Sequence, residues 1–199
     1  MAMLEPTYST DGFTPASRRG PYRIQDYFAL PEEPRCELLF GRFYVVPSPN
    51  VGHQSLVVAL TRILDDVARA TGGKALCAPM DVVLSPHTVL QPDVLYISPA
   101  RLGIVRERIE GAPDLVVEIL SPGTSRRDRG GKMQIYAEAG VVEYWIVDPV
   151  SEQVELYVNA GGAFTVVVPH NDRYRSAMLP GIGLDIAQLW ADTTRRTQG

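Results

Sequence analysis

The sequence has few of the residues that build several common kinds of functional site. Its 199 residues include two cysteines, and Cys36 and Cys77 stand far apart with no CxxC pair. This spacing argues against a zinc site and a disulfide framework. Together with the lack of a signal-like apolar segment at the N-terminus, this cysteine spacing favours a reducing, cytoplasmic setting. No apolar stretch approaches the roughly 18 to 20 residues of a membrane-spanning helix, so we expect no membrane partner.

An excess of charge of one sign is also lacking. The 19 basic and 23 acidic residues leave a net charge of −4, which neither predicts nor excludes a nucleic-acid partner, and phosphate contacts would need a local patch. Only Lys74 and Lys132 are lysines, and a lysine can donate or accept a proton where arginine cannot. The Walker, GxGxxG, GxSxG and HExxH motifs are absent, which leaves metal chemistry at acidic residues as the main catalytic option.

The order of the predicted elements indicates one α/β domain. We expect a poorly ordered leader at 1–20, a single domain at 21–192 and a tail at 193–199. Strands are predicted at 36–46 (two, around a turn near Gly41), 75–85, 91–98, 113–120, 143–149, 153–159 and 163–169, with 86–89 as a separator and a loop to about residue 111. Helices are predicted at 51–70, 126–139 and 185–192, with a short amphipathic segment at 22–30. This alternation favours a mixed sheet flanked by helices.

One carboxylate, Glu118, lies inside the apolar run 116–120, which is typical of a strand covered on both faces. Asp114 is on the same side of that strand but about 13 Å away at roughly 3.3 Å per residue, too far to share an ion. Asp93, in the apolar run after Pro92, is the better partner, since a neighbouring strand could bring the two together. A buried lone carboxylate costs several kcal/mol, and a divalent cation between two of them removes that cost.

Each of these carboxylates also has a structural alternative. Glu118 could pair with an arginine of the segment 125–129, and Asp93 could cap the turn after Pro92. For Asp114, which follows Pro113, the capping role is the favoured interpretation.

Three further side chains are candidates for the same site. Lys132 could fold back to the carboxylates and polarise an attacking water, or form an ordinary helical pair with Asp128 four residues before it. Glu37 could reach the site or be an edge-strand carboxylate. For His53, at the start of a predicted helix, a capping or surface role is favoured over a functional one.

The runs CELLFGRFYVVPSPNVGHQSL, QPDVLYIS and PDLVVEILSPGTSRRDRGGKMQIYAEAGVVEYWIVDP resemble the Uma-type family of predicted restriction endonucleases, within the PD-(D/E)XK nuclease superfamily. The resemblance covers roughly residues 20 to 190. It implies a restriction-endonuclease-like core with an acidic site at the strand ends. Asp93 and Glu118 correspond to the two acids of the superfamily motif, and Glu37 to an early Glu-Leu-x-x-Gly element. Leu120 occupies the place of the motif's lysine, and the resemblance implies that Lys132 replaces it.

The resemblance implies a metal-dependent endonuclease that hydrolyses DNA. Asp93, Glu118 and the backbone carbonyl of Ile119 are then the expected ligands of Mg²⁺ or Mn²⁺, with Glu37 and Lys132 in the catalytic group. Arg126, Arg127 and Arg129 are candidates for the phosphate backbone, or else form a solvated turn. A non-catalytic nucleic-acid-binding or scaffold protein of the same fold is the alternative, and an RNA substrate stays open. A homodimer is expected, with strands 153–159 and 163–169 as its edge.

Overall fold

The computed structural model describes Tyr8 and residues 19–197, and for residues 194–197 it describes the backbone alone. The predicted leader, residues 1–20, therefore lies almost entirely outside the described residues. None of the helices in the described part of the chain is both long enough and apolar enough to cross a lipid bilayer.

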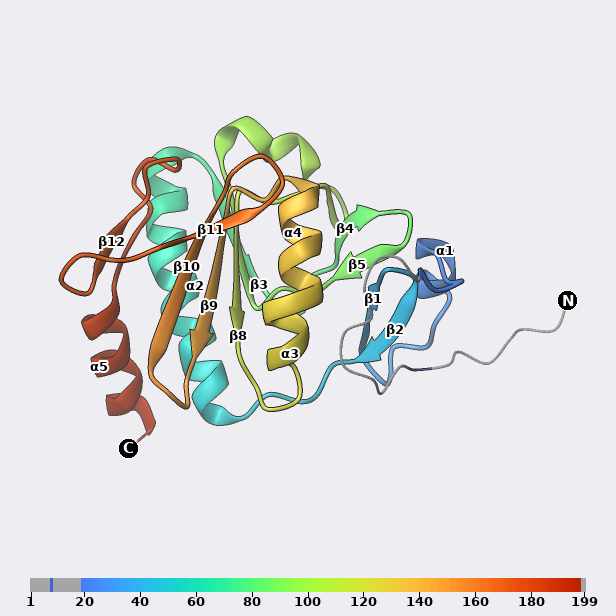
Figure 1. The fold of residues 1–199 in the computed structure, drawn as a ribbon, viewed down its shortest axis with the longest axis horizontal. Helices are drawn as coiled ribbons and strands as arrows, with labels where there is room; N and C mark the ends of the chain where they lie inside the picture. Colours follow the sequence, from blue (N-terminus) through green and yellow to red (C-terminus); the bar gives the residue numbers. More distant parts are fainter. Residues whose placement is uncertain (1–7, 9–18, 198–199) are drawn as a thin grey trace, which may run out of the picture.

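A six-stranded sheet forms the centre of the fold (Figure 1). Its order is β11-β10-β9-β8-β6-β3, with β3 (Lys74–Cys77), β6 (Val94–Ile97), β8 (Leu115–Ile119), β9 (Glu143–Asp148), β10 (Gln153–Asn159) and β11 (Phe164–Val167). Strands β8 and β9 are parallel, and the other neighbours are antiparallel. The predicted mixed sheet is confirmed.

A second, five-stranded sheet has the order β2-β1-β5-β4-β7. It contains β1 (Cys36–Leu39), β2 (Arg42–Val45), β4 (Val82–Ser85), β5 (Thr88–Leu90) and β7 (Ile109–Glu110). The predicted separator 86–89 is partly wrong, because Thr88 and Val89 belong to β5. Only Pro86 and His87 form the turn of the β4–β5 hairpin. Strands β12 (Arg173–Arg175) and β13 (Gly183–Asp185) form a separate pair.

The long helix α2 (Val51–Thr71) begins and ends as its sequence predicts. The side chain of Asn50 accepts a hydrogen bond from the N–H of His53, and Gly72 ends the helix with a φ of 80°. The other helices are α1 (Ile24–Phe28), the 3₁₀ helix η2 (Pro99–Ile104), α3 (Ser125–Arg127), the π-helical turn η3 (Asp128–Lys132), α4 (Met133–Ala139) and α5 (Ile186–Thr197). Helix η2 lies where a loop was predicted. Helix α5 continues through residues 193–197, which were predicted as part of the tail.

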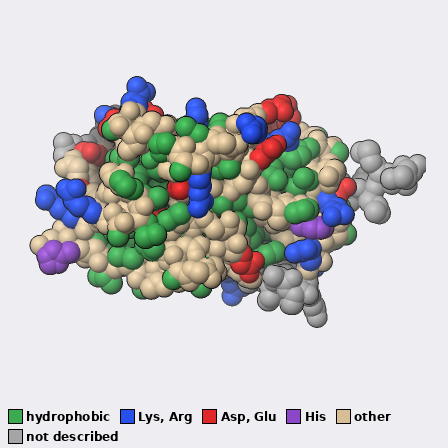
Figure 2. Space-filling view, turned by 90° about the horizontal axis from the view of Figure 1, so that it is seen from above, with side chains coloured by type: hydrophobic (Ala, Val, Ile, Leu, Met, Phe, Trp, Pro, Cys, Tyr) green, Lys and Arg blue, Asp and Glu red, His purple; other side chains and the backbone are tan. Residues whose placement is uncertain are grey.

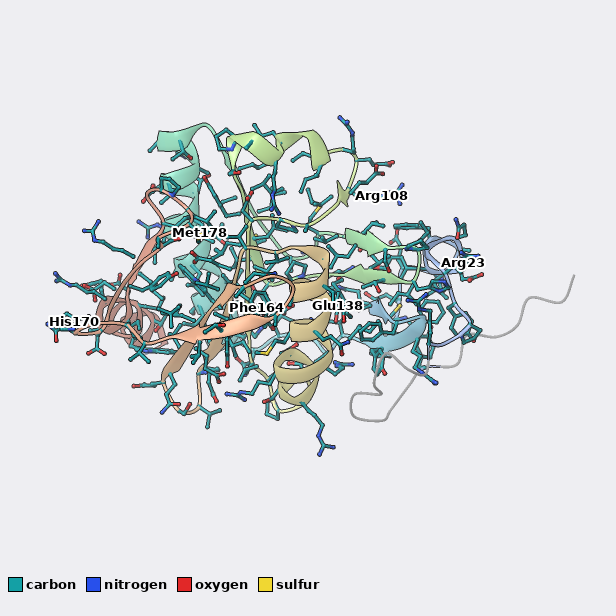
Figure 3. The ribbon with its side chains drawn as sticks, turned by 45° about the horizontal axis from the view of Figure 1, so that its top comes forward. Arg23, Arg108, Glu138, Phe164, His170 and Met178 are labelled. Atoms are coloured by element: carbon teal, nitrogen blue, oxygen red, sulfur yellow. The ribbon has the colours of Figure 1, made fainter. Side chains whose placement is uncertain are left out.

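The two faces of the large sheet pack against different helices. Leu115, Val117 and Ile119 of β8 belong to an apolar cluster with α2 and α5, whereas Val116 belongs to a cluster with α4. Figure 1 shows α3 and α4 between the large sheet and the smaller one, with α2 and α5 on the other side. Figure 3 shows Phe164 of β11 near α4, where it packs against the second cluster. Strand β8 is buried on both faces, as its apolar run predicts.

Candidate functional site

Asp93 and Glu118 lie at the ends of two neighbouring antiparallel strands. Val94 of β6 faces Val117 of β8, and continuing this register by one residue sets Asp93 opposite Glu118. Cross-strand partners point to the same face of a sheet. Oδ2 of Asp93 accepts a hydrogen bond of 2.7 Å from the N–H of Ile119. The side chain of Asp93 therefore reaches across to β8, beside Glu118.

The ammonium group of Lys132 joins three carboxylates. Its Nζ lies 3.0 Å from Oε1 of Glu118, 3.0 Å from Oε1 of Glu37 and 3.5 Å from Oδ1 of Asp128. Lys132 is only 4% exposed. The structural alternative, a helical pair with Asp128, is thus present, but as the longest of the three contacts. Glu118 pairs with this lysine and not with an arginine of the segment 125–129.

A π-helical turn carries Lys132 into the site. Residues Asp128–Lys132 form this turn between α3 and α4, and the hydroxyl of Tyr144 anchors it by donating to the carbonyl of Asp128 at 3.1 Å. Single π-turns inside helices are frequent at functional sites. Asp128, Lys132 and Tyr136 follow one another at intervals of four residues, so all three face the strands.

Tyr136 is a site residue that the sequence analysis missed. Its hydroxyl donates a hydrogen bond of 2.7 Å to Oε1 of Glu118, the same oxygen that Lys132 contacts. The sequence could have indicated Tyr136, because it lies four residues after Lys132 and residues at this spacing share one helix face. Gln91 was missed as well: its N–H donates to Oε1 of Glu37 at 2.8 Å. No local pattern in the sequence marks Gln91, because its contact with Glu37 joins residues 54 positions apart.

Burial and charge shift the ionisation of this cluster. Burial raises the pKa of Glu118 well above its usual value, although Lys132 opposes the shift. Burial likewise raises the pKa of Asp128, again opposed by Lys132. Burial alone would lower the pKa of Lys132, but Glu118, Glu37 and Asp128 together raise it well above its usual value. The lysine is therefore a firmly held ammonium, and the carboxylates around it outnumber it.

His53 reaches the same site from the first turn of α2. Its Nε2 lies 3.3 Å from Oδ2 of Asp93, while its Nδ1 is buried without a hydrogen-bond partner. Burial lowers the pKa of His53, but Asp93 and the backbone carbonyl of Ile119 outweigh it, so the pKa is raised. The favoured interpretation as a surface residue is therefore incomplete, because its ring contacts a predicted site carboxylate. The ring of His87 instead bonds the carbonyl of Tyr22, and Figure 3 shows His170 at the far end of the molecule.

The donor set at the strand ends fits a hard divalent cation. Within the described residues no three side chains among His, Cys, Asp and Glu are grouped to hold an ion, so an ion here would use two carboxylates, backbone oxygen and water. Asp93 and Glu118 each use one oxygen in the contacts above, which leaves the other oxygen of each as a ligand. Mg²⁺ sites commonly combine one or two carboxylates with several waters. Such an ion would offset the cost of burying these carboxylates.

These residues line one cavity of about 440 Å³. Among the segments that line it are those where the chain enters α2 and leaves β8, and these lie at the lower end of the view in Figure 1. Its ionisable lining consists of Glu37, Asp93, Glu118, Asp128, Lys132, His53, Arg35 and Arg127. Leu120, in the place of the superfamily lysine, lines it too and packs in the apolar cluster with α4. An aliphatic side chain there closes the core beneath the site.

The three arginines predicted to contact phosphates do not lie together. Arg127 lines the cavity. Arg129 lies outside it, with Nη2 2.6 Å from Glu155 and 3.3 Å from Asp148. Arg126 is exposed and shares a shallow depression with Arg129. Only Arg127 is thus placed beside the acidic cluster.

Asp114 has the structural role that its sequence context favours. Its Oδ2 accepts a hydrogen bond of 2.7 Å from the N–H of Ser98, and its Oδ1 lies 3.3 Å from Nε of Arg101. These contacts anchor the start of β8 to η2, and Asp114 does not line the cavity.

Comparisons with known proteins bear on the fold and the family of this chain. A putative nuclease belonging to DUF820 from Anabaena variabilis shares the fold with a TM-score of 0.73 at 20% sequence identity, over 87% of this chain and 99% of that one. The chain therefore has the mixed α+β fold of a nuclease-like protein. Residues 24–187 match the family described as "Uma2: Putative restriction endonuclease". The chain belongs to this family.

A curated relative matches a shorter stretch. An uncharacterized protein of Synechocystis sp. is 46% identical over 46 residues, which is 23% of this chain and 24% of that protein. The match thus spans about a quarter of that relative and says nothing of its activity.

Proposed function

We propose that this protein is a divalent-metal-dependent endonuclease that hydrolyses phosphodiester bonds in DNA. The observation that carries the proposal is the contact between the Lys132 ammonium and Glu118, on the strand whose neighbour brings Asp93 to the same cavity. Two acids at adjoining strand ends, with a lysine from the π-helical turn that follows, suit phosphodiester hydrolysis, because negative charge grows on the phosphate in the transition state. The family match supports the same reaction class.

In this proposal Asp93, Glu118 and the carbonyl of Ile119 hold Mg²⁺ or Mn²⁺. Such an ion, when bound, supplies a water of lowered pKa and offsets charge on the phosphate oxygens. The chain's own contribution is to fix these oxygens. Asp93 is held by the N–H of Ile119, and Glu118 is held by Tyr136.

The proposed role of Lys132 is that of a hydrogen-bond donor to the attacking water or to a phosphate oxygen. Because its pKa is raised well above the usual value, it stays protonated at neutral pH and does not act as a base. Glu37 belongs to the catalytic group as the second carboxylate that holds the ammonium, at 3.0 Å. A fixed ammonium needs no reorganisation when charge develops on the phosphate.

The test is cleavage of supercoiled plasmid DNA with metal added or withheld. We expect nicking by the wild type with Mg²⁺ or Mn²⁺, none with EDTA, and a loss of at least about a hundredfold in Asp93→Asn and Glu118→Gln. Glu138→Gln is the matched control, because Glu138 is exposed on α4 and, within the described part of the chain, its side chain bonds Gln134 alone. Full activity of both site variants would contradict the assignment.

The same assay separates the rival functions. A non-catalytic binding or scaffold protein would bind DNA but leave plasmid and RNA intact under every metal, and calorimetry with millimolar Mn²⁺ would detect no heat of binding. Cleavage of RNA alone would change the substrate class and keep the site.

The homodimer stays a prediction. Strand β11 lies at the edge of the large sheet, and its Val166 is 58% exposed, which suits pairing with a second chain. Sedimentation of the wild type tests it.

A further inference from the structure

Arg35 and Arg127 line the acidic cavity without an acidic partner. Both belong to its wall, yet none of the ion pairs among the described residues includes either one. The nearby carboxylates of Glu37, Glu118 and Asp128 are shared by Lys132. Two guanidinium charges therefore face the cavity while its carboxylates are engaged elsewhere.

Arg127 is held in place by neutral contacts. It is 9% exposed, its guanidinium carbon lies 5.2 Å from the centre of the Tyr44 ring, and its Nη2 donates to the carbonyl of Val45 at a long 3.5 Å. Its Nε is buried and has no hydrogen-bond partner. A buried N–H without an acceptor costs free energy, and here the group also carries a full charge. An anion in the cavity would offset this charge and offer the guanidinium group an acceptor.

Arg35 reaches the cavity from the residue before β1. Its Nη2 donates to Oε1 of Gln91 at 2.8 Å, and its Nε, like that of Arg127, is buried and unpartnered. The carbonyl of Arg35 accepts a hydrogen bond of 2.9 Å from the N–H of Val46, next to the Val45 carbonyl that Arg127 contacts. Both arginines thus contact the open end of the β1–β2 hairpin, Arg35 through its backbone and Arg127 through its side chain.

We propose that Arg35 and Arg127 form a clamp for one backbone phosphate of the bound DNA. Guanidinium groups bind phosphate through paired N–H donors, and each of these arginines has an N–H without an acceptor. Because neutral groups fix both side chains, a phosphate displaces no existing ion pair. The nucleic-acid identity of the ligand rests on the proposed function, whereas the anion site itself rests on these contacts.

One residue ties the clamp to the lysine cluster. The side chain of Gln91 accepts a hydrogen bond from Arg35, and the backbone N–H of Gln91 donates one to Glu37. Glu37 in turn forms an ion pair with Lys132. Gln91 is itself fixed, because its Nε2 donates to Asp81 at 2.9 Å. A phosphate in the clamp is therefore held in a defined place relative to the Lys132 ammonium, and the neighbouring phosphodiester bond is positioned for attack.

In the described part of the chain, the face of the molecule seen in Figure 2 carries no dense cluster of basic side chains that could bind DNA instead. That view, from above in the orientation of Figure 1, shows Lys and Arg side chains scattered among acidic and apolar ones. The segments where the chain enters α2 and leaves β8, which line the cavity, lie at the opposite end.

The test is binding of a fluorescein-labelled DNA duplex, followed by fluorescence anisotropy in EDTA so that no cleavage occurs. We expect Arg35→Met and Arg127→Met each to weaken binding about tenfold, because a hydrogen bond to a charged group is lost. Each change should also lower the slope of log Kd against log salt by about one. The matched control is Arg23→Met, which removes the same charge from the exposed surface beside α1 (Figure 3).

The double variant decides whether the two arginines share a phosphate. We expect its loss of affinity to be smaller than the product of the single losses, because residues that contact one group are coupled. Single variants that bind like Arg23→Met, or a double variant that equals the product, would overturn the clamp. Arg35 is only partly buried, so its variant remains informative if Arg127→Met unfolds.

The outcomes also separate this inference from the proposed function. Arginine-dependent binding without metal-dependent cleavage would keep the clamp and remove the nuclease. Cleavage with binding that ignores both arginines would keep the nuclease and remove the clamp.

Discussion

Replacing Lys132 by methionine tests whether this one ammonium holds the buried carboxylates together. Methionine keeps much of the apolar stem and removes the charge that lies 3.0 Å from Glu37, 3.0 Å from Glu118 and 3.5 Å from Asp128. Breaking a buried ion pair at one partner typically costs about 3 to 5 kcal/mol, because an uncompensated charge stays behind. Against a total stability of about 5 to 15 kcal/mol for an ordinary domain, this is a large loss.

The loss should depend on pH. Burial raises the pKa of both Glu118 and Asp128, and Lys132 opposes this rise, so both pKa values move higher still in the variant. An acid whose pKa is raised by folding stabilises the protein below its unfolded pKa, and this contribution is lost as the pH rises through the folded value. In the variant the folded pKa values are higher, so this stabilising contribution is lost over a wider range of pH than in the wild type. Its deficit relative to the wild type is therefore small near about pH 4, close to the usual carboxyl pKa, and grows toward neutral pH.

Urea denaturation at about pH 5 and about pH 8 measures this difference in the free energy of unfolding. Lys74→Met is the matched control, because Lys74 is the other lysine and is exposed on β3. We expect it to change the stability by less than about 0.5 kcal/mol at either pH. A Lys132→Met variant as stable as this control at about pH 8, or one with a deficit independent of pH, would refute the reasoning.

Two further variants test single contacts. Tyr136→Phe removes the donor to Glu118 and should lower the free energy of unfolding in urea by about 1 to 3 kcal/mol; an unchanged midpoint would show that the bond is dispensable. Asp114→Asn weakens the contacts to Ser98 and Arg101 and should lower the stability by about 1 to 3 kcal/mol, with unchanged cleavage per folded molecule. A selective loss of cleavage would assign Asp114 to the site.

The acids of the candidate site were marked in the sequence by a local signal. Glu118 interrupts an apolar strand, and the two-residue repeat of strands fixes the face to which it points. Asp93 follows a proline at the start of another apolar run. The structure places the two on neighbouring strands. Helix α2 was predictable for the same reason, with apolar residues at helical spacing and Gly72 after its last turn.

The partners of these acids could not be predicted, because they depend on tertiary packing. The Gln91 contact with Glu37 spans 54 residues of sequence and exists because β1 lies beside β5. Arg35 and Arg127 both contact the backbone of one hairpin, at Val46 and Val45. Strand β5 was hidden because a proline precedes its short apolar run. Such contacts leave no periodic pattern in the chain.

The most direct test of the proposed site is a crystal of the protein soaked with Mn²⁺ and measured for anomalous scattering. We expect a peak between the carboxylates of Asp93 and Glu118 in the wild type, and none in Glu118→Gln. The absence of a peak in the wild type at millimolar Mn²⁺, with both carboxylates well ordered, would contradict the metal-dependent nuclease. A peak that persists in Glu118→Gln would contradict the role of Glu118.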